Sequence, residues 1–578
     1  MTNVRSPLDP IQVEITYNAL KSISDEMFVA LKRSAYSTNI KERQDHSTVI
    51  ADADGRLVVQ AEASLPIHIA SMTGLVRGIV AKYGKTLAPG DLFFANDPHV
   101  AGGTHLPDIN MAMPVFKDGR LVCFVCNIAH HADVGGMAPG SMAGGMSEIY
   151  QEGLRIPVLR LLRDYQVQED LLELALLNVR VPTERRGDYF AQIASCRLGE
   201  RRMLELLANV EVDALHSIFS DLIARTRSRM LRHIEALPDG VYSFSDRMDD
   251  DGLGNDQVPI TVRIEKTGSE ILFDFTGTSP QVRGNINLTL NATHAAVCYC
   301  LKALLDPDVP NNDGLLSIPT IRAPEGTLVN AVFPAPVAGR AHTCQRVIDV
   351  ILGAFATSLP DRVVGAANGA NTTAVFSGVD PRSGERYVYL ETLGGGFGGR
   401  ATRDGTDGVQ VHITNTSNLP VEAIETEYPL LVERYELVQD SGGAGQHRGG
   451  MAIRRVIRPV DHDCIFSGMG ERFHNRPWGV FGGEPGRCGQ FRLKTAEGES
   501  LLSSKPLEIH VTDGRSIVVE TPGAGGYGKP TDRSAEDLAR DRRENRYSAA
   551  FIESHYGAAN DHPKEAVPGQ AKAAESAA

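Results

Sequence analysis

The 578-residue sequence predicts a mixed α+β protein of several domains, and three observations support that fold class. Segments with helical periodicity occupy the first 35 residues and much of the stretch from 168 to 236. Alternating, strand-like segments dominate from about residue 240 onward. A chain of this length, with 42% hydrophobic residues, exceeds what one hydrophobic core usually supports.

The first elements are expected to be two helices separated by a hairpin. A helix is expected from Asp9 to about Ser37, because apolar residues recur there near the 3.6-residue period. Residues 46–60 have the pattern of a hairpin. A second amphipathic helix is expected from about His68, and Gly84 is a suitable end for it.

Three short apolar runs then predict buried strands, at residues 91–95, 111–116 and 121–129. Polar, glycine-rich stretches follow the first and the third run, at residues 96–108 and 130–145. The expected result is a sheet that carries polar loops at its ends.

The helical stretch that follows can either pack on this sheet or form a bundle. Farther on, helical interruptions are expected at residues 295–305 and 346–359. After Pro530 the apolar content is low, which predicts a frayed helix or a disordered tail. The expected parts are a sheet and helix domain over 1–165, a helical region over 166–238, a strand-rich region over 239–530 and a tail over 531–578.

The composition excludes several classes of protein. A formal charge of -14 without a basic cluster argues against nucleic-acid binding. No apolar run reaches membrane-spanning length and the start lacks a signal-peptide core, so we expect a cytoplasmic protein with no membrane contact. Eight scattered cysteines do not resemble a disulfide scaffold, and Cys123 and Cys126 lie in a strand-like run that favours core packing over metal binding.

Familiar nucleotide and nucleophile motifs are missing or out of context. Gly394, Gly396 and Gly399 match G-x-G-x-x-G, but turn-forming residues follow where the dinucleotide motif requires a helix. The sequence contains neither a Walker phosphate loop nor a G-x-S-x-G nucleophile elbow.

A dense group of histidines and carboxylates lies in the two glycine-rich stretches. Imidazole and carboxylate are ligands of zinc, manganese and iron, and a catalytic ion needs three or four of them. The alternative is that these histidines are hydrogen-bonded residues that order the loops, and spacing alone leaves both interpretations open. The group consists of Asn96, Asp97, His99, His105, Asp108, His130, His131 and Asp133.

Several segments resemble the hydantoinase B/oxoprolinase family. They include NDPHVAGGTHLPDINMAMPVF, AHHADVGGMAPGSM, YQEGLRIPVLRL, LETLGGGFGGRATRDGTDGVQVH and PGAGGYG, in the family's order, so the resemblance covers roughly residues 8 to 530. Members of this family include subunits of ATP-dependent N-methylhydantoinases, 5-oxoprolinases and lactamases, and the metal-bearing subunits of acetone and acetophenone carboxylases.

The resemblance implies that two different subunits of a hetero-oligomer carry out separate steps of one reaction. A hydantoinase A-type partner subunit would bind ATP and Mg and phosphorylate the substrate carbonyl, and this subunit would complete the reaction. Carried over residue by residue, the metal ligands would be Asp45, His105, His130 and Asp133. His131 and Asp108 would then be proton-transfer candidates.

The leading hypothesis is therefore a subunit of an ATP-dependent cyclic-amide hydrolase, acting on a hydantoin, 5-oxoproline or a related lactam. Phosphorylation activates the amide, and water activated by a divalent transition metal attacks the ring carbon. The first alternative is a subunit of a ketone carboxylase of the acetone or acetophenone type. The second is a non-catalytic scaffold whose glycine loops complete the partner's active site.

Overall fold

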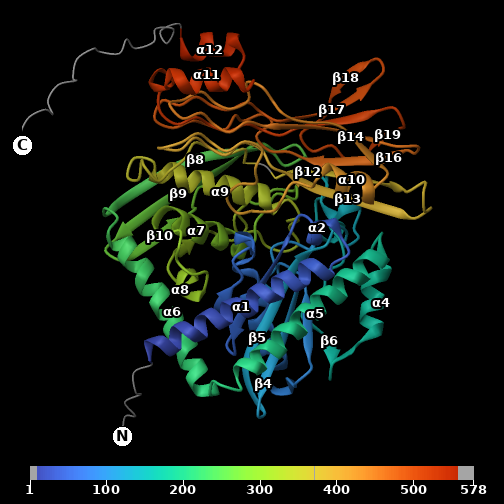
Figure 1. The fold of residues 1–578 in the computed structure, drawn as a ribbon, viewed down its shortest axis with the longest axis vertical. Helices are drawn as coiled ribbons and strands as arrows, with labels where there is room; N and C mark the ends of the chain where they lie inside the picture. The colour runs from blue at the N-terminus through green and yellow to red at the C-terminus, as the bar shows by residue number, and fades with distance from the viewer. Residues whose placement is uncertain (1–8, 370, 558–578) are drawn as a thin grey trace, which may run out of the picture.

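The computed structural model describes residues 9–369 and 371–557, so the last part of the expected tail, from 558 on, lies outside the described residues. A seven-stranded antiparallel sheet forms the base of the N-terminal half, in the order β2-β1-β5-β4-β3-β6-β7 (Figure 1). Its strands are β1 (His46–Asp52), β2 (Leu57–Gln60), β3 (Leu92–Ala95), β4 (Asp108–Lys117), β5 (Arg120–His130), β6 (Leu159–Arg163) and β7 (Gln166–Val167). The expected hairpin and the three expected strands all belong to this one sheet.

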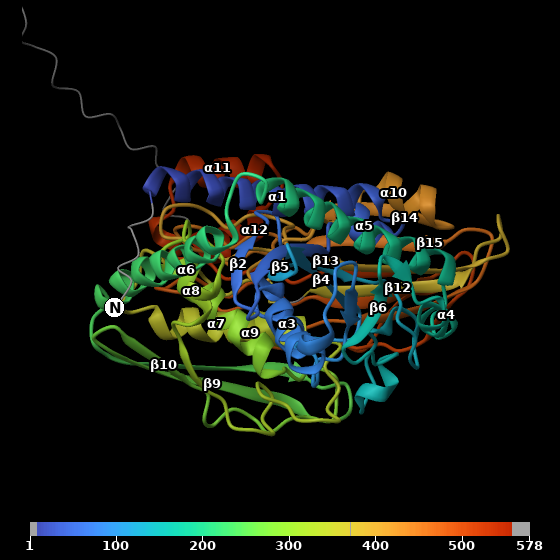
Figure 2. The same cartoon turned by 90° about the horizontal axis from the view of Figure 1, so that it is seen from below.

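Helices cover both faces of the sheet, and Figure 2 shows the layers in section. One face packs against α1 (Pro10–Ser34) and α5 (Pro182–Leu206), which cross β1, β4 and β5. The other face packs against α3 (Ser71–Tyr83). Alternate residues along β5 separate the two cores, since Val125 belongs to the first and Phe124 to the second.

The helices of the expected helical region pack on the sheet and do not form a separate bundle. Besides α5, this region contains α4 (Glu169–Leu177) and α6 (Val212–Glu235). Helix α6 spans both cores, because Phe219 in its first half packs with the α1 and α5 layer and Met230 in its second half packs with the opposite layer.

The first helix ends at Ser34, three residues earlier than expected. The backbone N–H groups of Tyr36 and Ser37 donate to Oδ1 of Asp188 instead of continuing the helix. The Ser37 side chain then caps a short second helix, α2 (Thr38–Lys41). This break directs the chain toward the end of the sheet where the polar loops gather.

A second sheet lies beyond α3, with the order β11-β10-β9-β8. It packs against α9 (Arg340–Phe355), a helix in which every residue is buried, and α9 packs against α7 (Leu290–Leu305). Both helices fall where helical interruptions were expected. The remaining elements are β8 (Gly240–Asp250), β9 (Asp256–Thr267), β10 (Glu270–Asp274), α8 (Asp313–Leu316) and β11 (Thr320–Arg322).

The C-terminal part contains two further antiparallel sheets, in the orders β13-β12-β16-β19 and β14-β15-β20-β17-β18. Their shared core confirms a strand-rich region, and together the elements confirm the predicted α+β class. No helix within 9–369 or 371–557 is long and apolar enough to cross a membrane. The elements are β12 (Thr372–Val379), β13 (Arg386–Leu393), α10 (Val421–Glu427), β14 (Leu430–Leu437), β15 (Ile453–Pro459), β16 (Cys464–Met469), β17 (Gln490–Thr495), β18 (Gly498–Leu501), β19 (Ile509–Val511) and β20 (Ser516–Glu520).

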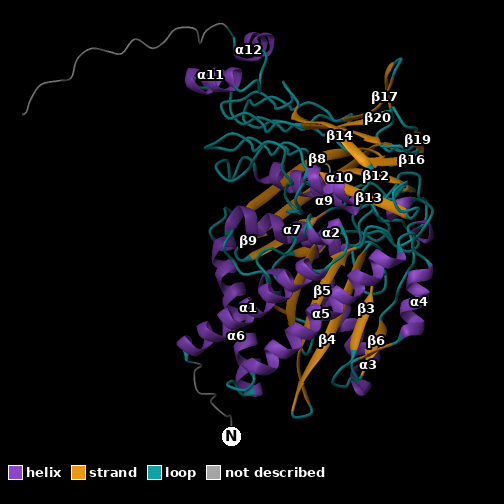
Figure 3. Ribbon diagram, turned by 45° about the vertical axis from the view of Figure 1, so that its right-hand side comes forward, coloured by secondary structure: helices purple, strands orange, loops and turns teal. Residues whose placement is uncertain are grey.

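Glycine-rich loops beside these sheets stack backbone against backbone, as the loop segments in the upper left of Figure 3 show. Neighbouring segments exchange main-chain hydrogen bonds, for example Gly399 N to Gly525 O at 2.9 Å and Gly525 N to Ala366 O at 2.8 Å. A Cβ atom built on Gly398 would lie 1.8 Å from the carbonyl oxygen of Gly365. Glycine is therefore required at this position because two backbones approach each other closely, and not because the residue has a positive φ.

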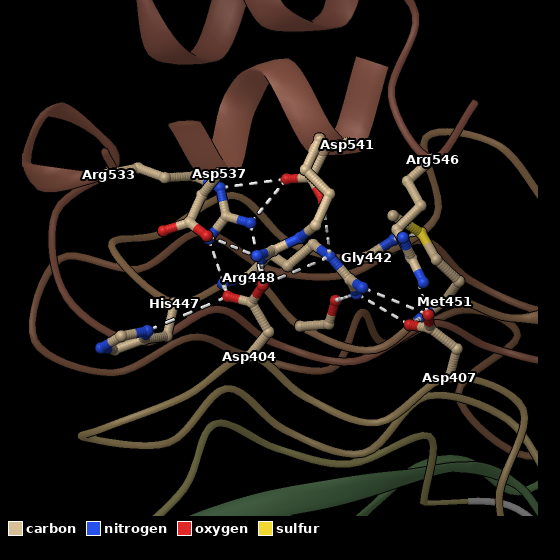
Figure 4. A network of polar contacts seen from close by, with 12 residues as sticks. Asp404, Asp407, Gly442, His447, Arg448, Met451, Arg533, Asp537, Asp541 and Arg546 are labelled. Carbon is tan, nitrogen blue, oxygen red and sulfur yellow. Dashed lines mark hydrogen bonds and ion pairs between the residues drawn. The ribbon is translucent and has the colours of Figure 1, made fainter. Parts of the chain in front are cut away.

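The expected tail contains two ordered helices, α11 (Ala535–Arg543) and α12 (Ala549–Tyr556). Figure 4 shows the ion-pair network that holds them to the glycine-rich loops. Arg533 joins Asp404 at 2.7 Å to Asp541 at 2.6 Å, and Arg448 pairs with Asp407 at 2.7 Å. The low apolar content was misleading here, because buried ion pairs and the ring of Tyr547 attach the segment.

Candidate metal centre

Three neighbouring strands bring the predicted site residues to one end of the first sheet. Asp108 begins β4 and His130 ends β5, and the two residues are direct partners in the antiparallel register. Asp45 immediately precedes β1, and its carbonyl oxygen accepts a hydrogen bond from the backbone N–H of His130 at 3.0 Å. The strand pairing itself therefore assembles side chains that lie up to 85 residues apart in the sequence.

Three of the predicted residues form a compact donor group. Ligand atoms of His105, Asp108 and His130 all lie within 4.8 Å of one another. His105 comes from the loop before β4, and both His105 and Asp108 are completely buried. His130 retains 4% exposure.

The contact between His105 and Asp108 places two acceptor atoms where a cation could bind both of them. Nδ1 of His105 donates to the carbonyl oxygen of Ala338 at 3.0 Å, which places the lone pair of the neutral ring on Nε2. That atom faces Oδ1 of Asp108 at 3.0 Å, and neither atom has a hydrogen-bond partner. Two facing acceptors in a buried place repel each other, whereas a metal ion between them would satisfy both.

The electrostatics keep these groups in the protonation states that bind metals. Burial lowers the pKa of His105 and of His130, so both rings are neutral. Burial opposes ionisation of Asp108, but His105 and His68, when protonated at low pH, and the permanent charge of Arg340 outweigh it and hold the pKa of the carboxyl well below its usual range. A neutral imidazole and an ionised carboxylate are the forms in which these side chains bind a metal ion.

Asp45 lies beside this group but is not one of the three residues within 4.8 Å of one another. Its Oδ2 is 3.8 Å from Nη2 of Arg43, and its side chain keeps 11% exposure. Burial raises the pKa of Asp45, and the charge of Arg43 counters that effect. The carboxylate therefore lies on the accessible side of the site.

Four further residues complete the site, and sequence reasoning missed them in this role. The amide nitrogen of Asn39 is 2.8 Å from Nδ1 of His130, and the amide oxygen of Asn39 accepts a hydrogen bond from Nη1 of Arg43. Nε2 of His68 lies 3.7 Å from Oδ2 of Asp108 without a hydrogen-bond partner. Nη2 of Arg340 donates to the same oxygen at 2.7 Å. No local pattern marks these residues, because they come from three separate segments: Asn39 and Arg43 from the first, His68 from the second and Arg340 from the third.

The structure places two other predicted residues differently from the expectation. Oδ1 of Asp133 accepts from Gly135 N and Arg180 N, and Oδ2 accepts from Gly140 N and Arg180 Nη1, all between 3.0 and 3.1 Å. The carboxylate is thus fully used in holding the turn after β5. His131 points toward α5, where its Nε2 contacts Oε1 of Gln192 at 2.9 Å. Adjacent residues at a strand end face opposite sides, which separates His131 from His130.

The remaining polar residues of the first loop order the loop itself. Nδ2 of Asn96 donates to the carbonyl oxygens of Leu106 and Leu154. Asp97 pairs with Arg155 at 2.7 Å, and Nε2 of His99 donates to the carbonyl oxygen of Ala335 at 3.1 Å. For these three residues the structural interpretation of the polar group holds.

Comparison with known proteins identifies the family of this chain. Residues 9–530 match the Hydantoinase B/oxoprolinase family. The chain belongs to that family. This family member is 30% identical to the caprolactamase subunit beta of Pseudomonas jessenii, over 96% of this chain and 97% of that protein. It is also 33% identical to 5-oxoprolinase 1 of Arabidopsis thaliana, over 90% of this chain but 42% of that protein.

Solved structures of relatives share the fold of this family member. The crystal structure of the ATP-dependent caprolactamase from Pseudomonas jessenii superposes with a TM-score of 0.89 at 28% identity and covers 96% of both chains. The nucleotide-free structure of an acetone carboxylase superposes with a TM-score of 0.88, covering 95% of this chain and 79% of that one. At 18% identity, the second likeness shows a common fold alone.

Proposed function

We propose that this chain is the metal-bearing subunit of an ATP-dependent cyclic-amide hydrolase, and that it opens a lactam or hydantoin ring whose carbonyl has been phosphorylated by an A-type partner subunit. The observation that carries the proposal is the pair of facing acceptor atoms on His105 and Asp108, beside His130. The relatives named as a caprolactamase subunit and as a 5-oxoprolinase support the substrate class. The length of 5-oxoprolinase 1, more than twice the matched part, supports the need for a partner.

Asp45, His105, Asp108 and His130 would hold a divalent zinc, manganese or iron ion. When bound, such an ion polarises an oxygen atom and makes water a better nucleophile near neutral pH. The carbonyl of Ala338 fixes the tautomer of His105.

Other side chains of the site would handle the proton and exclude water. The oxygen of a first water bonds to the ring carbon of the phosphorylated amide, the ring C–N bond breaks, and the nitrogen leaves as an amine that carries the two protons of that water. The acyl phosphate formed in this way is hydrolysed by a second water, which yields the carboxylate and free phosphate. Burial lowers the pKa of His68, so its unpartnered Nε2 is free to accept the proton of the attacking water. His68 takes the place of His131 in this role, since His131 points toward α5. The near-complete burial of the site protects the activated ring from bulk solvent.

The experiment is reconstitution of the chain with its A-type partner, followed by metal analysis and an assay of lactam-dependent ATP hydrolysis with ring opening. We expect about one divalent ion per wild-type chain. His105→Ala should lose the ion and reduce ring opening at least about 100-fold. His99→Ala is the matched control, because His99 lies in the same loop but contacts Ala335. Metal-free wild-type protein with full ring-opening activity would refute the proposal.

A further inference from the structure

Arg340 is the first residue of α9, and its guanidinium group is only partly engaged. Nε donates to Oγ1 of Thr104 at 3.0 Å, and Nη2 donates to Oδ2 of Asp108 at 2.7 Å. Nη1 has no hydrogen-bond partner among the described residues and is not one of the fully buried unpartnered atoms, so the 6% of the side chain that stays exposed leaves this donor accessible. An accessible donor on an otherwise buried guanidinium group is available to a ligand that supplies an acceptor.

Arg340 lies within electrostatic reach of the whole site. Burial is the largest influence on the pKa of each of its five titratable neighbours. The positive charge of Arg340 also shifts the pKa of all five. Arg43, the other buried guanidinium nearby, already donates to Asn39 and to Thr392. Arg340 is therefore the better placed of the two to meet an incoming group. The five neighbours are Asp45, His68, His105, Asp108 and His130.

The position of Arg340 indicates what kind of group that is. Its Nη2 pairs with the carboxylate of Asp108 at 2.7 Å, so the guanidinium group lies directly beside the donor group and its positive charge favours an anionic ligand. A phosphoryl group is an anion with three acceptor oxygens, so it suits the remaining donor of Arg340 better than a neutral carbonyl group does.

We propose that Nη1 of Arg340 binds a phosphoryl oxygen of the substrate that the partner subunit has phosphorylated. This inference rests on the proposed function and assigns the part of the site that receives the phosphoryl group. A phosphoryl group offers more acceptor oxygens and more negative charge than a carboxylate substituent, and the guanidinium group of arginine is well suited to phosphate oxygens.

The test measures anion binding to the metal-loaded full chain by isothermal titration calorimetry, with inorganic phosphate and with acetate as probes. Wild type should bind phosphate more tightly than acetate. Arg340→Gln should weaken phosphate binding by about 10-fold to 100-fold while metal content stays the same. Arg340→Lys keeps the charge and provides a second variant. Arg180→Lys is the matched control, because Arg180 also donates to a buried aspartate and a carbonyl, outside the donor group.

Three results would overturn the inference. The first is that wild type and Arg340→Gln bind phosphate with equal affinity. The second is that wild type binds phosphate and acetate with equal affinity. The third is that both Arg340 variants lose the metal, which would limit the role of Arg340 to holding Asp108. A wild-type chain that takes up no divalent ion contradicts the proposed function and this inference with it. A metal-loaded wild type whose phosphate affinity matches that of Arg340→Gln overturns this inference alone.

Discussion

Asp108 and His130 face each other across β4 and β5 as register partners at the ends of the two strands. Their pairing, with His105 beside them, defines the donor group, whereas Asp133 lies three residues past the strand end and holds a turn. We expect Asp108→Asn to abolish stoichiometric metal binding, as measured by mass spectrometry of the purified chain. Asp133→Asn should keep the metal and lower the free energy of unfolding by about 1 to 3 kcal/mol, because several hydrogen bonds to the carboxylate weaken. Metal loss in Asp133→Asn alone would reverse this assignment.

Glu152 should make the protein less stable as the pH rises. Oε1 accepts a hydrogen bond from Ala338 N at 2.7 Å and Oε2 has no partner, and burial raises the pKa of the carboxyl to about 8. The unfolded chain releases this proton near pH 4.5, so the folded state binds the extra proton between pH 4.5 and 8 and loses stability over that window. Chemical denaturation from pH 5 to 8 should show wild type losing on the order of 3 kcal/mol relative to Glu152→Gln. Parallel stability curves for the two proteins would contradict this.

His342 should have the opposite dependence on pH. Burial, aided by the charge of Lys505, lowers the pKa of His342 to about 4. The unfolded chain takes up this proton near pH 6.5 and the folded chain only near pH 4, so stability is present above pH 6.5 and is lost as the pH falls through that window. Relative to His342→Asn, the wild-type free energy of unfolding should fall by roughly 3 kcal/mol between pH 6.5 and 4. A constant difference between the two proteins would show that His342 is not a buried neutral ring.

The buried pairs of Arg533 should decide whether the C-terminal helices stay attached. Arg533→Leu leaves Asp541 and Asp404 without this guanidinium, and removal of one partner from a buried ion pair costs about 3 to 5 kcal/mol. Limited proteolysis should then release α11 and α12 at protease concentrations that leave wild type intact. Arg540→Ala is the control, since Arg540 is 41% exposed and its loss should cost less than about 1 kcal/mol. Equal resistance of both variants to the protease would contradict the role of the network.

The stacked glycine segments should not tolerate a methyl group. Gly398→Ala would place a Cβ 1.8 Å from the carbonyl oxygen of Gly365, which is backbone and cannot rotate away. We expect at least about 3 kcal/mol lower stability in urea denaturation. Gly240→Ala, where the atom nearest to the added Cβ is Oη of Tyr242 at 3.8 Å, should change stability by less than about 1 kcal/mol. A tolerated Gly398→Ala would mean that the segments separate easily.

The sequence was sufficient to predict the class of fold and the polar loops of the site, because those features are local. Short apolar runs marked the strands that became β3, β4 and β5, and histidines beside glycines marked their ends. Strand alternation could have separated His131 from His130, but only if the last residue of β5 were known. Asp133 was indistinguishable from a ligand, because the same carboxylate suits a metal ion and a tight turn.

Other features depend on contacts between distant segments, which one sequence does not reveal. Arg340 reaches Asp108 across 232 residues, and the tautomer of His105 is set by the carbonyl of Ala338, 233 residues away. The glycine clusters were visible, but a left-handed turn and a close backbone contact both select glycine. The sequence therefore could not say that close contact explains Gly398.

The site is assembled across the boundary between two layers. The sheet supplies the donor atoms. The segment that leads into α9 supplies the Ala338 carbonyl that fixes the proton on His105, and the first residue of α9 supplies the charge that flanks Asp108. Sliding of α9 along its own axis would move these two contacts in concert, changing ring basicity and local charge in a single displacement. The position of α9 relative to the sheet therefore affects the chemistry of the site, and a mutation remote from every ligand can alter reactivity by shifting that helix.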